Sequence, residues 1–198
     1  MASITQTVAP TVEPISLETA RLHLKVDDVS DNDLITSLIT VSRRWCETRI
    51  GQRLITSTNV LRLDAFPAWH IELPYPPLIA VSSIAYTDAS GSSQTLSASL
   101  YKVDANSKPG RITPSWGNVW PTTRDEMDAV TITYTAGYGA AATSVPETIR
   151  QAMLLLIGHL YENRSATTED ALKDVPMSVE ALLSSEWHGS YSLAGVSC

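Results

Sequence analysis

Apolar residues recur every three or four positions in two segments, which is the spacing of one helix face. In the first segment, residues 31–50, the stripe is formed by Leu34, Leu38, Val41 and Trp45, with Ile35, Ile39 and Cys46 beside it. Ser30 and Asp33 form a possible capping pair at its start. Gly51 follows it, as expected of a glycine that ends a helix. The pattern predicts a long amphipathic helix that ends at residue 50.

The second segment, residues 144–165, carries a wider apolar stripe built on Ile149, Met153, Leu156 and Leu160. Ser144 and Glu147 have the spacing of a capping box, and Pro146 suits the first helical turn. Because a helix this apolar needs other elements around it, the pattern predicts the central helix of a helical core.

Two shorter helices are predicted at the ends of the chain. Ser16 is a candidate N-cap for a helix with Leu17, Ala20, Leu22 and Leu24. Near the C-terminus, residues 175–185 place Val179, Leu182 and Leu183 on one face. Residues 1–14 are small and polar and contain two prolines, which predicts a flexible arm. Such an arm is either a frayed terminus or a segment that orders on a partner.

Helical periodicity is absent from the middle of the chain, where short runs of strand-forming residues alternate with turns. The clearest run is residues 129–136, where Val130, Ile132 and Tyr134 alternate with threonines. Further strands are predicted at residues 58–64, 70–73, 78–88, 100–104 and 110–113. Several short strands in sequence predict a small antiparallel sheet or an open barrel.

These elements together predict an α+β protein: a helical bundle core of about four helices with a small antiparallel β region inserted into it. The expected divisions are an arm at 1–14, a helical core at 15–53 and 144–186, a β-rich insertion at 54–143, and a C-terminal tail at 187–198.

Composition narrows the class of protein further. The 198 residues carry a net charge of −7 and 43% hydrophobic residues, which is enough for a core. The acidic balance argues against tight wrapping of nucleic acid, which needs a basic surface.

Cys46 and Cys198 form neither a disulfide framework nor a zinc spacing. No signal peptide is visible, and the longest apolar run, residues 152–157, is too short for a bilayer. We expect a soluble intracellular protein that does not enter a membrane.

Candidate chemistry is sparse. The four histidines, His23, His70, His159 and His188, have no ligand spacing to one another or to a cysteine. The acids of residues 27–33 lack the glycine and the closing glutamate of a calcium loop. No set of nucleophile, base and orienting group can be assembled from the sequence. We therefore expect no catalytic, cofactor or metal site, and no enzyme activity.

Three stretches share a distinctive order of motifs. Residues 15–54 contain a short ISLETARLHL helix, an acidic break, and a helix that ends Glu47-x-x-x-Gly51-x-x-Leu54. Residues 132–164 read ITYTAGYGAAATSVPETIRQAMLLLIGHLYENR, and residues 174–187 read DVPMSVEALLSSEW. In this order the three stretches resemble the tailed-phage head–tail connector (adaptor) family, which includes the adaptors of gene transfer agents.

The resemblance implies a structural role without cofactors. Proteins of this family form a ring of copies, usually a dodecamer, beneath the portal protein at the head vertex. They extend the DNA channel and dock a stopper or another neck or tail protein. DNA passes through the channel without sequence-specific binding. The expected location is the neck of a virion or phage-like particle, assembled in the bacterial cytoplasm.

Within this resemblance, several residues are candidates for subunit or partner interfaces. Arg43, Arg44 and Arg49 could meet the acids of residues 27–33 or 125–128 on the next subunit, or they could pair within the chain. Trp187 and Tyr191 would belong to a portal-facing tail. The loop with Trp116 and Trp120 either packs over the sheet or contacts a neighbouring subunit or stopper.

Two other functions stay open from the sequence. In the first, the β region is a binding module for a glycan or peptide with Trp116 and Trp120 as its platform, which predicts a monomer that binds a ligand. In the second, the protein is a small hydrolase with dispersed acids, which predicts a concave pocket with perturbed carboxyl groups.

Overall fold

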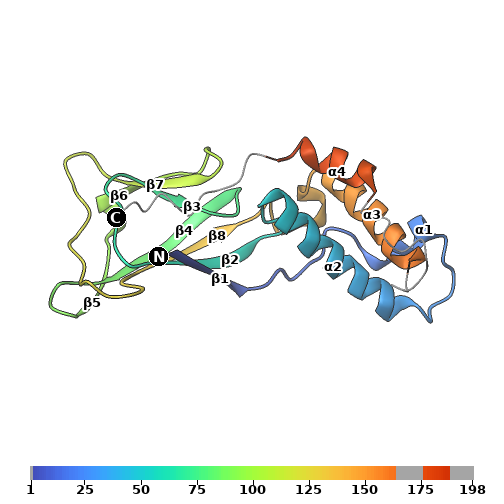
Figure 1. Ribbon diagram of the computed structural model, residues 1–198, viewed down its shortest axis with the longest axis horizontal. Coiled ribbons are helices and arrows are strands. Elements are labelled where there is room, and N and C mark those ends of the chain that lie inside the picture. Colours follow the sequence, from blue (N-terminus) through green and yellow to red (C-terminus); the bar gives the residue numbers. More distant parts are fainter. Residues whose placement is uncertain (1, 164–175, 188–198) are drawn as a thin grey trace. The chain divides into compact units, whose positions relative to one another are not determined.

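The computed structural model describes residues 2–163 and 176–187, which contain four α-helices and eight β-strands (Figure 1). The helices are α1 (Leu17–Leu24), α2 (Asn32–Ile50), α3 (Glu147–Glu162) and α4 (Met177–Ser184). The strands are β1 (Ala2–Val8), β2 (Ser57–Leu63), β3 (Ile71–Leu73), β4 (Leu78–Thr87), β5 (Ser93–Thr95), β6 (Tyr101–Asp104), β7 (Gly110–Pro114) and β8 (Val130–Ala136). The predicted α+β class is confirmed.

The chain divides into two compact units. Residues 2–10 and 56–138 form the β-rich unit, and residues 11–55, 139–163 and 176–187 form the helical unit. The helical unit combines segments from both sides of the β-rich sequence. We describe each unit by itself.

The β-rich unit holds two antiparallel sheets. The larger has the strand order β1-β2-β8-β4-β5, and the smaller has the order β3-β7-β6. Strand β8 lies in the middle of the larger sheet and alternates buried and half-buried residues along its whole length. Its inward residues, Val130, Ile132 and Tyr134, join one apolar core with Leu61, Leu73, Ile84 and Ile112. The alternation in the sequence therefore marks the centre of the sheet.

The N-terminal segment differs from the predicted flexible arm. Residues 2–8 form β1, which pairs with β2 in a register that matches Ala2 with Leu63 and Ile4 with Leu61. Ala2 and Ile4 pack against the apolar core of the unit. An arm of small and β-branched residues has little structure of its own, and the neighbouring strand supplies the hydrogen-bonding partner that orders it.

In the helical unit, α3 contacts α1, α2 and α4. The predicted stripe is confirmed at its centre, because Ile149, Met153 and Leu156 are buried together with Ala152 and Ile157, whereas Leu160 is half-buried. The described helices thus surround α3, as its wide apolar face requires.

Two predicted caps are wrong and two predicted helix ends are right. Ser144 lies in a 3₁₀ turn, Ala142–Ser144, and α3 starts one residue after Pro146 without a side-chain cap. Likewise Ser30 donates its hydroxyl to Asp28 rather than capping α2. In contrast, Ser16 accepts a hydrogen bond from the Thr19 amide, and Gly51 ends α2 in the left-handed conformation at φ 68°. At both failed sites a local turn between neighbouring residues replaces the expected cap.

The face of α2 that is buried also differs from the prediction. Ile35, Ile39, Cys46 and Ile50 are buried, whereas Val41 is 51% exposed. The buried face includes the charged residues Arg43 and Glu47, which a search for apolar periodicity counts as outward-facing. These two side chains form the first candidate site.

Candidate interaction surfaces

A buried ion-pair network lies at the C-terminal end of α2. The Glu47 carboxylate accepts hydrogen bonds from Nη1 of Arg43 at 3.2 Å and from Nη1 of Arg53 at 3.3 Å. Its other oxygen, Oε1, accepts the backbone amide of Leu54 at 3.0 Å. Only 3% of the Glu47 side chain is exposed. A buried carboxylate must be paired and hydrogen-bonded to be tolerated, and here all three partners come from its own neighbourhood in the chain.

This geometry explains the Glu47-x-x-x-Gly51-x-x-Leu54 motif. Gly51 adopts the left-handed conformation that ends the helix, so the chain turns back across the last turn of α2. The turn brings the amide of Leu54 to Glu47. The three residues of the motif are therefore a device for ending a helix and fixing the segment that follows it.

Glu13 extends the network to the segment before α1. Its carboxylate accepts Nε of Arg43 at 2.7 Å and the hydroxyl of Thr40 at 3.0 Å. Arg43 thus pairs with acids on two sides and is only 5% exposed. The structure places Arg43 inside the helical unit, where these acids of its own chain satisfy its charge.

Cys46, next to this network, gives a prediction about thiol reactivity. Burial and, second, the charge of Glu47 raise the pKa of the Cys46 thiol from 9.0 to about 12. We expect the folded Cys198→Ser variant to be inert to Ellman's reagent at pH 8 and to react fully in denaturant. Between pH 9 and 12 only the unfolded thiol ionises, so the free energy of unfolding should fall as pH rises. Rapid labelling of the folded variant would contradict this burial.

The other two arginines on α2 are exposed but differ in their partners. Arg44 forms no ion pair with any residue in the described part of the chain. Arg49 pairs with Glu180 of α4, with Nε 2.9 Å and 2.8 Å from the two carboxylate oxygens. The hydrogen bond and the charge of Glu180 raise the pKa of Arg49. Of the three arginines, Arg44 alone is exposed without an ion pair in the described residues, which is what the interface hypothesis requires of a cation.

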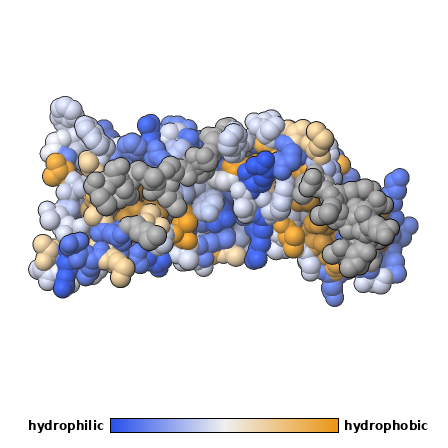
Figure 2. Space-filling model, in the orientation of Figure 1, coloured by the Kyte–Doolittle hydropathy of each residue, from blue (hydrophilic) through white to orange (hydrophobic). Residues whose placement is uncertain are grey.

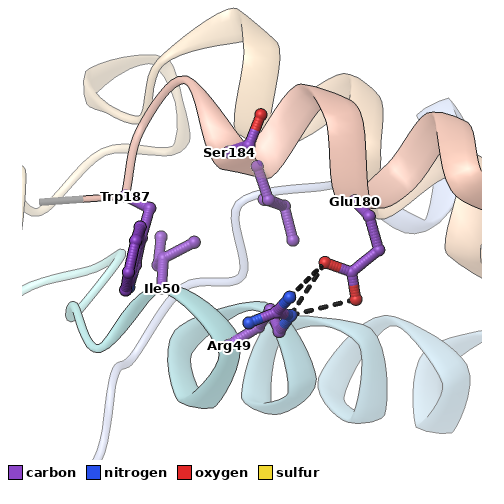
Figure 3. Close-up of a pocket in the computed structure, with 6 residues that line it drawn as sticks. Arg49, Ile50, Glu180, Ser184 and Trp187 are labelled. Atoms are coloured by element: carbon purple, nitrogen blue, oxygen red, sulfur yellow. Dashed lines mark hydrogen bonds and ion pairs between the residues drawn. The ribbon is translucent and has the colours of Figure 1, made fainter. Parts of the chain in front are cut away.

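Arg49 and Glu180 also border a small pocket between α2 and the C-terminal end of α4 (Figure 3). The pocket has a volume of about 150 Å³, and its lining includes Ile50, Leu183 and Trp187. Trp187 is 53% exposed although one side of its ring faces this lining. The pocket combines an apolar floor with a charged rim, and it is large enough for one side chain rather than for a substrate.

The aromatic loops form a second surface in the β-rich unit. Trp120 stacks on Phe66 with ring centroids 4.9 Å apart and an interplanar angle of 5°. Its indole nitrogen donates to the backbone carbonyl of Trp69 at 3.3 Å. In the same region the amide of Asp128 donates to the Asp64 carboxylate at 3.1 Å. These contacts join the loop after β2 to the loop before β8.

Large apolar side chains project from this joined pair of loops. Trp69 is 81% exposed, Trp116 is 97% exposed, and Val119 and Met127 are both 87% exposed. Figure 2 shows apolar residues interrupting the hydrophilic surface in several places on the face it presents. We call Trp69, Trp116, Val119 and Met127 the aromatic loop patch. The sequence left open whether this loop packs on the protein or is exposed for a partner. In the structure Trp120 packs on Phe66, whereas Trp116 is exposed.

Sequence reasoning missed Trp69, Phe66 and Glu13 as members of these surfaces. Trp69 follows Pro67 in a loop, which is a signal of the same kind as that of Trp116. Phe66 and Glu13 carry no local signal, since only the fold brings their partners to them. Tyr191 lies outside the described residues.

Neither metal chemistry nor membrane spanning gains support from the described part of the chain. Residues 2–163 and 176–187 contain no group of three or more histidine, cysteine, aspartate or glutamate side chains that could hold a metal ion. No helix in these residues is long and apolar enough to cross a membrane.

Comparisons with known proteins relate the chain to phage-like particles. Residues 14–106 match the model of the phage gp6-like head-tail connector protein family. A chain in the neck of an empty gene transfer agent (GTA) particle, computed with C6 symmetry, is 23% identical with a TM-score of 0.79, over 97% of this chain and 98% of that chain. A chain in the neck of a native GTA particle, computed with C12 symmetry, is 25% identical with a TM-score of 0.69, over 98% of each chain.

A chain of the native GTA virion is 22% identical with a TM-score of 0.76, over 96% of this chain and 97% of that chain. A comparison with curated proteins finds no match. The family match covers α1 to β6, and the structural likeness extends the shared fold to almost the whole chain. The resemblance indicated by the sequence motifs is thus confirmed by the match of residues 14–106 to the phage gp6-like head-tail connector protein family.

Proposed function

We propose that this protein is a structural connector in the neck of a phage-like particle. The observation that carries the proposal is a connector-family segment within a fold that is shared, over nearly the full length of both chains, with a GTA neck chain. In this proposal copies of the chain form a ring, of twelve subunits, beneath the portal protein. The ring extends the DNA channel, docks a stopper or another neck component, and has no catalytic role. It assembles in the bacterial cytoplasm.

The charge of the chain suits such a channel. Each copy carries a net charge of −7, so a ring of copies forms a strongly negative annulus. DNA that slides through this annulus is repelled by its walls, which favours passage over binding. No sequence recognition is needed for this role.

The two units suit different tasks in the proposed connector. We propose that α3 is the rigid post of the helical unit and that it forms a bundle core with the helices around it. Arg44, on the outward face of α2, is the cation available to an acidic patch of the next subunit. The aromatic loop patch is the candidate contact with the next neck component, because its four large apolar side chains are more than four-fifths exposed and a partner would bury them.

Native mass spectrometry of the full chain, alone and mixed with the portal protein of the same particle, tests the proposal. We expect a ring or a ring–portal complex. A chain that remains monomeric in both samples would overturn the connector function. If that monomer bound a glycan or peptide through Trp116, the ligand-binding alternative would replace it.

A substitution in the aromatic loop patch tests the assignment of that surface. Trp116→Ala removes a side chain that is 97% exposed, so the thermal midpoint should not change. We expect the affinity of the ring for the next neck component to fall about 30-fold or more, as for a central aromatic residue in an interface. Leu22→Ala, at a residue 74% exposed on α1, is the matched control. Equal binding of both variants in a pull-down would remove the patch from the interface.

A further inference from the structure

The larger sheet of the β-rich unit has an open edge at β1. Strand β1 is outermost in the order β1-β2-β8-β4-β5, and Figure 1 shows it beside β2 at the margin of the sheet. Its seven residues, ASITQTV, contain no charged residue and no proline. Among the described residues, no strand pairs with its outer side. An edge of this kind offers a row of unpaired backbone amides and carbonyls to another strand.

Edge strands of monomeric proteins are commonly protected by lysine, proline or a bulge. In β1 the register is regular from Ala2 to Gln6, and its one irregularity falls between Gln6 and Val8. The regular part of the strand is therefore free to add a neighbour. The chain as a whole has 35 charged side chains, obtained from 14 basic and 21 acidic residues, yet none falls on this edge.

The opposite margin of the same sheet is open as well. Strand β5 pairs only with Ala85–Thr87 of β4. The first part of β4, residues 78–83, has β8 on one side and no pairing strand on the other among the described residues. Its sequence, LIAVSS, is also uncharged, and Ile79 is 46% exposed. Two register irregularities on the β8 side fall in this stretch. One chain thus carries two different open edges of similar length.

The directions of the strands match these two edges to each other. β1 is antiparallel to β2, β2 to β8, and β8 to β4, so β1 and β4 run in opposite directions. In a ring whose axis runs along the strands, the rotation from one copy to the next would leave the strand directions unchanged. Placed beside β4 of an adjacent copy, β1 would therefore form an antiparallel pair and continue the alternation of the sheet.

We propose that the outer edge of β1 pairs with residues 78–83 of β4 in an adjacent copy of this chain. The inference rests on the proposed ring, because a head-to-tail ring requires two different surfaces on each subunit that complement each other. A second copy is the occupant that supplies the matching edge. Backbone pairing would give the interface its strength, and the absence of charge on both edges would remove one of the usual barriers to it.

Two consecutive proline substitutions test the pairing, whichever of the two backbone amides points outward. Successive amides in a strand point to opposite sides. One of the two variants, Thr5→Pro or Gln6→Pro, therefore removes a hydrogen bond to β2, and the other removes an amide donor on the outer edge of β1. We expect one variant to lower the thermal midpoint of the monomer. The other should keep that midpoint and weaken ring association about tenfold or more per interface in native mass spectrometry.

Substitutions at the β4 edge provide the reciprocal test. Ile79→Lys places a charge on the proposed pairing edge and should weaken the ring, whereas Val103→Lys on β6, at a residue 40% exposed, should not. Hydrogen exchange should show alternate β1 amides protected about tenfold or more only in the assembled ring. If every variant forms a normal ring and the outward amides of β1 stay unprotected in it, the edge pairing alone is overturned. A wild-type chain that forms no ring, even with portal protein, overturns the connector function as well.

Discussion

Replacing Glu47 with alanine is expected to lower the free energy of unfolding by about 3–5 kcal/mol, the cost of removing one partner from a buried ion pair. The change leaves Arg43, which is 5% exposed, with Glu13 as its remaining acid. It also removes the acceptor of the Leu54 amide at the turn that ends α2. Arg43 and the Leu54 amide are almost fully buried, so water can offset little of their loss.

Urea unfolding of the full chain, followed by circular dichroism, measures this effect. Arg44→Ala is the matched control, because Arg44 is the next residue along α2 after Arg43 but is exposed and should change stability by less than about 0.5 kcal/mol. Glu47→Gln should fall between the two, since the amide oxygen can still accept the Leu54 amide while the charge is lost. A loss below about 1 kcal/mol in Glu47→Ala would show that the network behaves as a surface ion pair.

A loss of similar size is expected in the β-rich unit when Tyr134 is replaced with alanine. Tyr134 is fully buried in the middle strand of the larger sheet, and its hydroxyl donates to the carbonyl of Pro74 at 2.7 Å. Removing the ring leaves a cavity among residues of the apolar core, which we expect to cost about 3–5 kcal/mol. Tyr134→Phe keeps the packing but leaves a buried carbonyl unpaired, at a cost of about 1–3 kcal/mol.

Thermal unfolding of the same set of variants checks the order of these effects. Thr135→Ala is the control, because Thr135 is the next residue of β8 and lies on the opposite face, where it is half-buried. We expect it to cost less than about 1 kcal/mol. If Tyr134→Phe destabilised the protein as much as Tyr134→Ala, the hydrogen bond to Pro74 rather than core packing would dominate at this position.

The three candidate arginines of α2 differ in their partners within the chain. Arg43, Arg44 and Arg49 are close in sequence, and the sequence left open whether they meet acids of the next subunit or pair within the chain. The fold gives Arg43 two acids of its own unit and Arg49 the exposed carboxylate of Glu180. Arg44 is exposed and forms no ion pair within the described residues. An ion pair between subunits is therefore proposed for one arginine rather than for a cluster.

The sequence by itself determined the elements whose signals are local. The stripe of α3, the Ser16 cap, the Gly51 end of α2 and the alternation of β8 depend on residues within a few turns of one helix or along one strand. The order of motifs also indicated the similarity to the connector family, because motif order is a property of the sequence alone.

Only the tertiary structure decided the features that depend on distant partners. β1 is a strand because β2, far along the chain, offers its edge. Glu13 and Arg43 are neighbours because the segment before α1 lies against α2. The buried face of α2 therefore includes Arg43 and differs from the face that apolar periodicity predicted. Trp120 is packed and Trp116 is exposed because Phe66 lies against one of them. Burial is a property of the surrounding chain, so a single residue type cannot specify it.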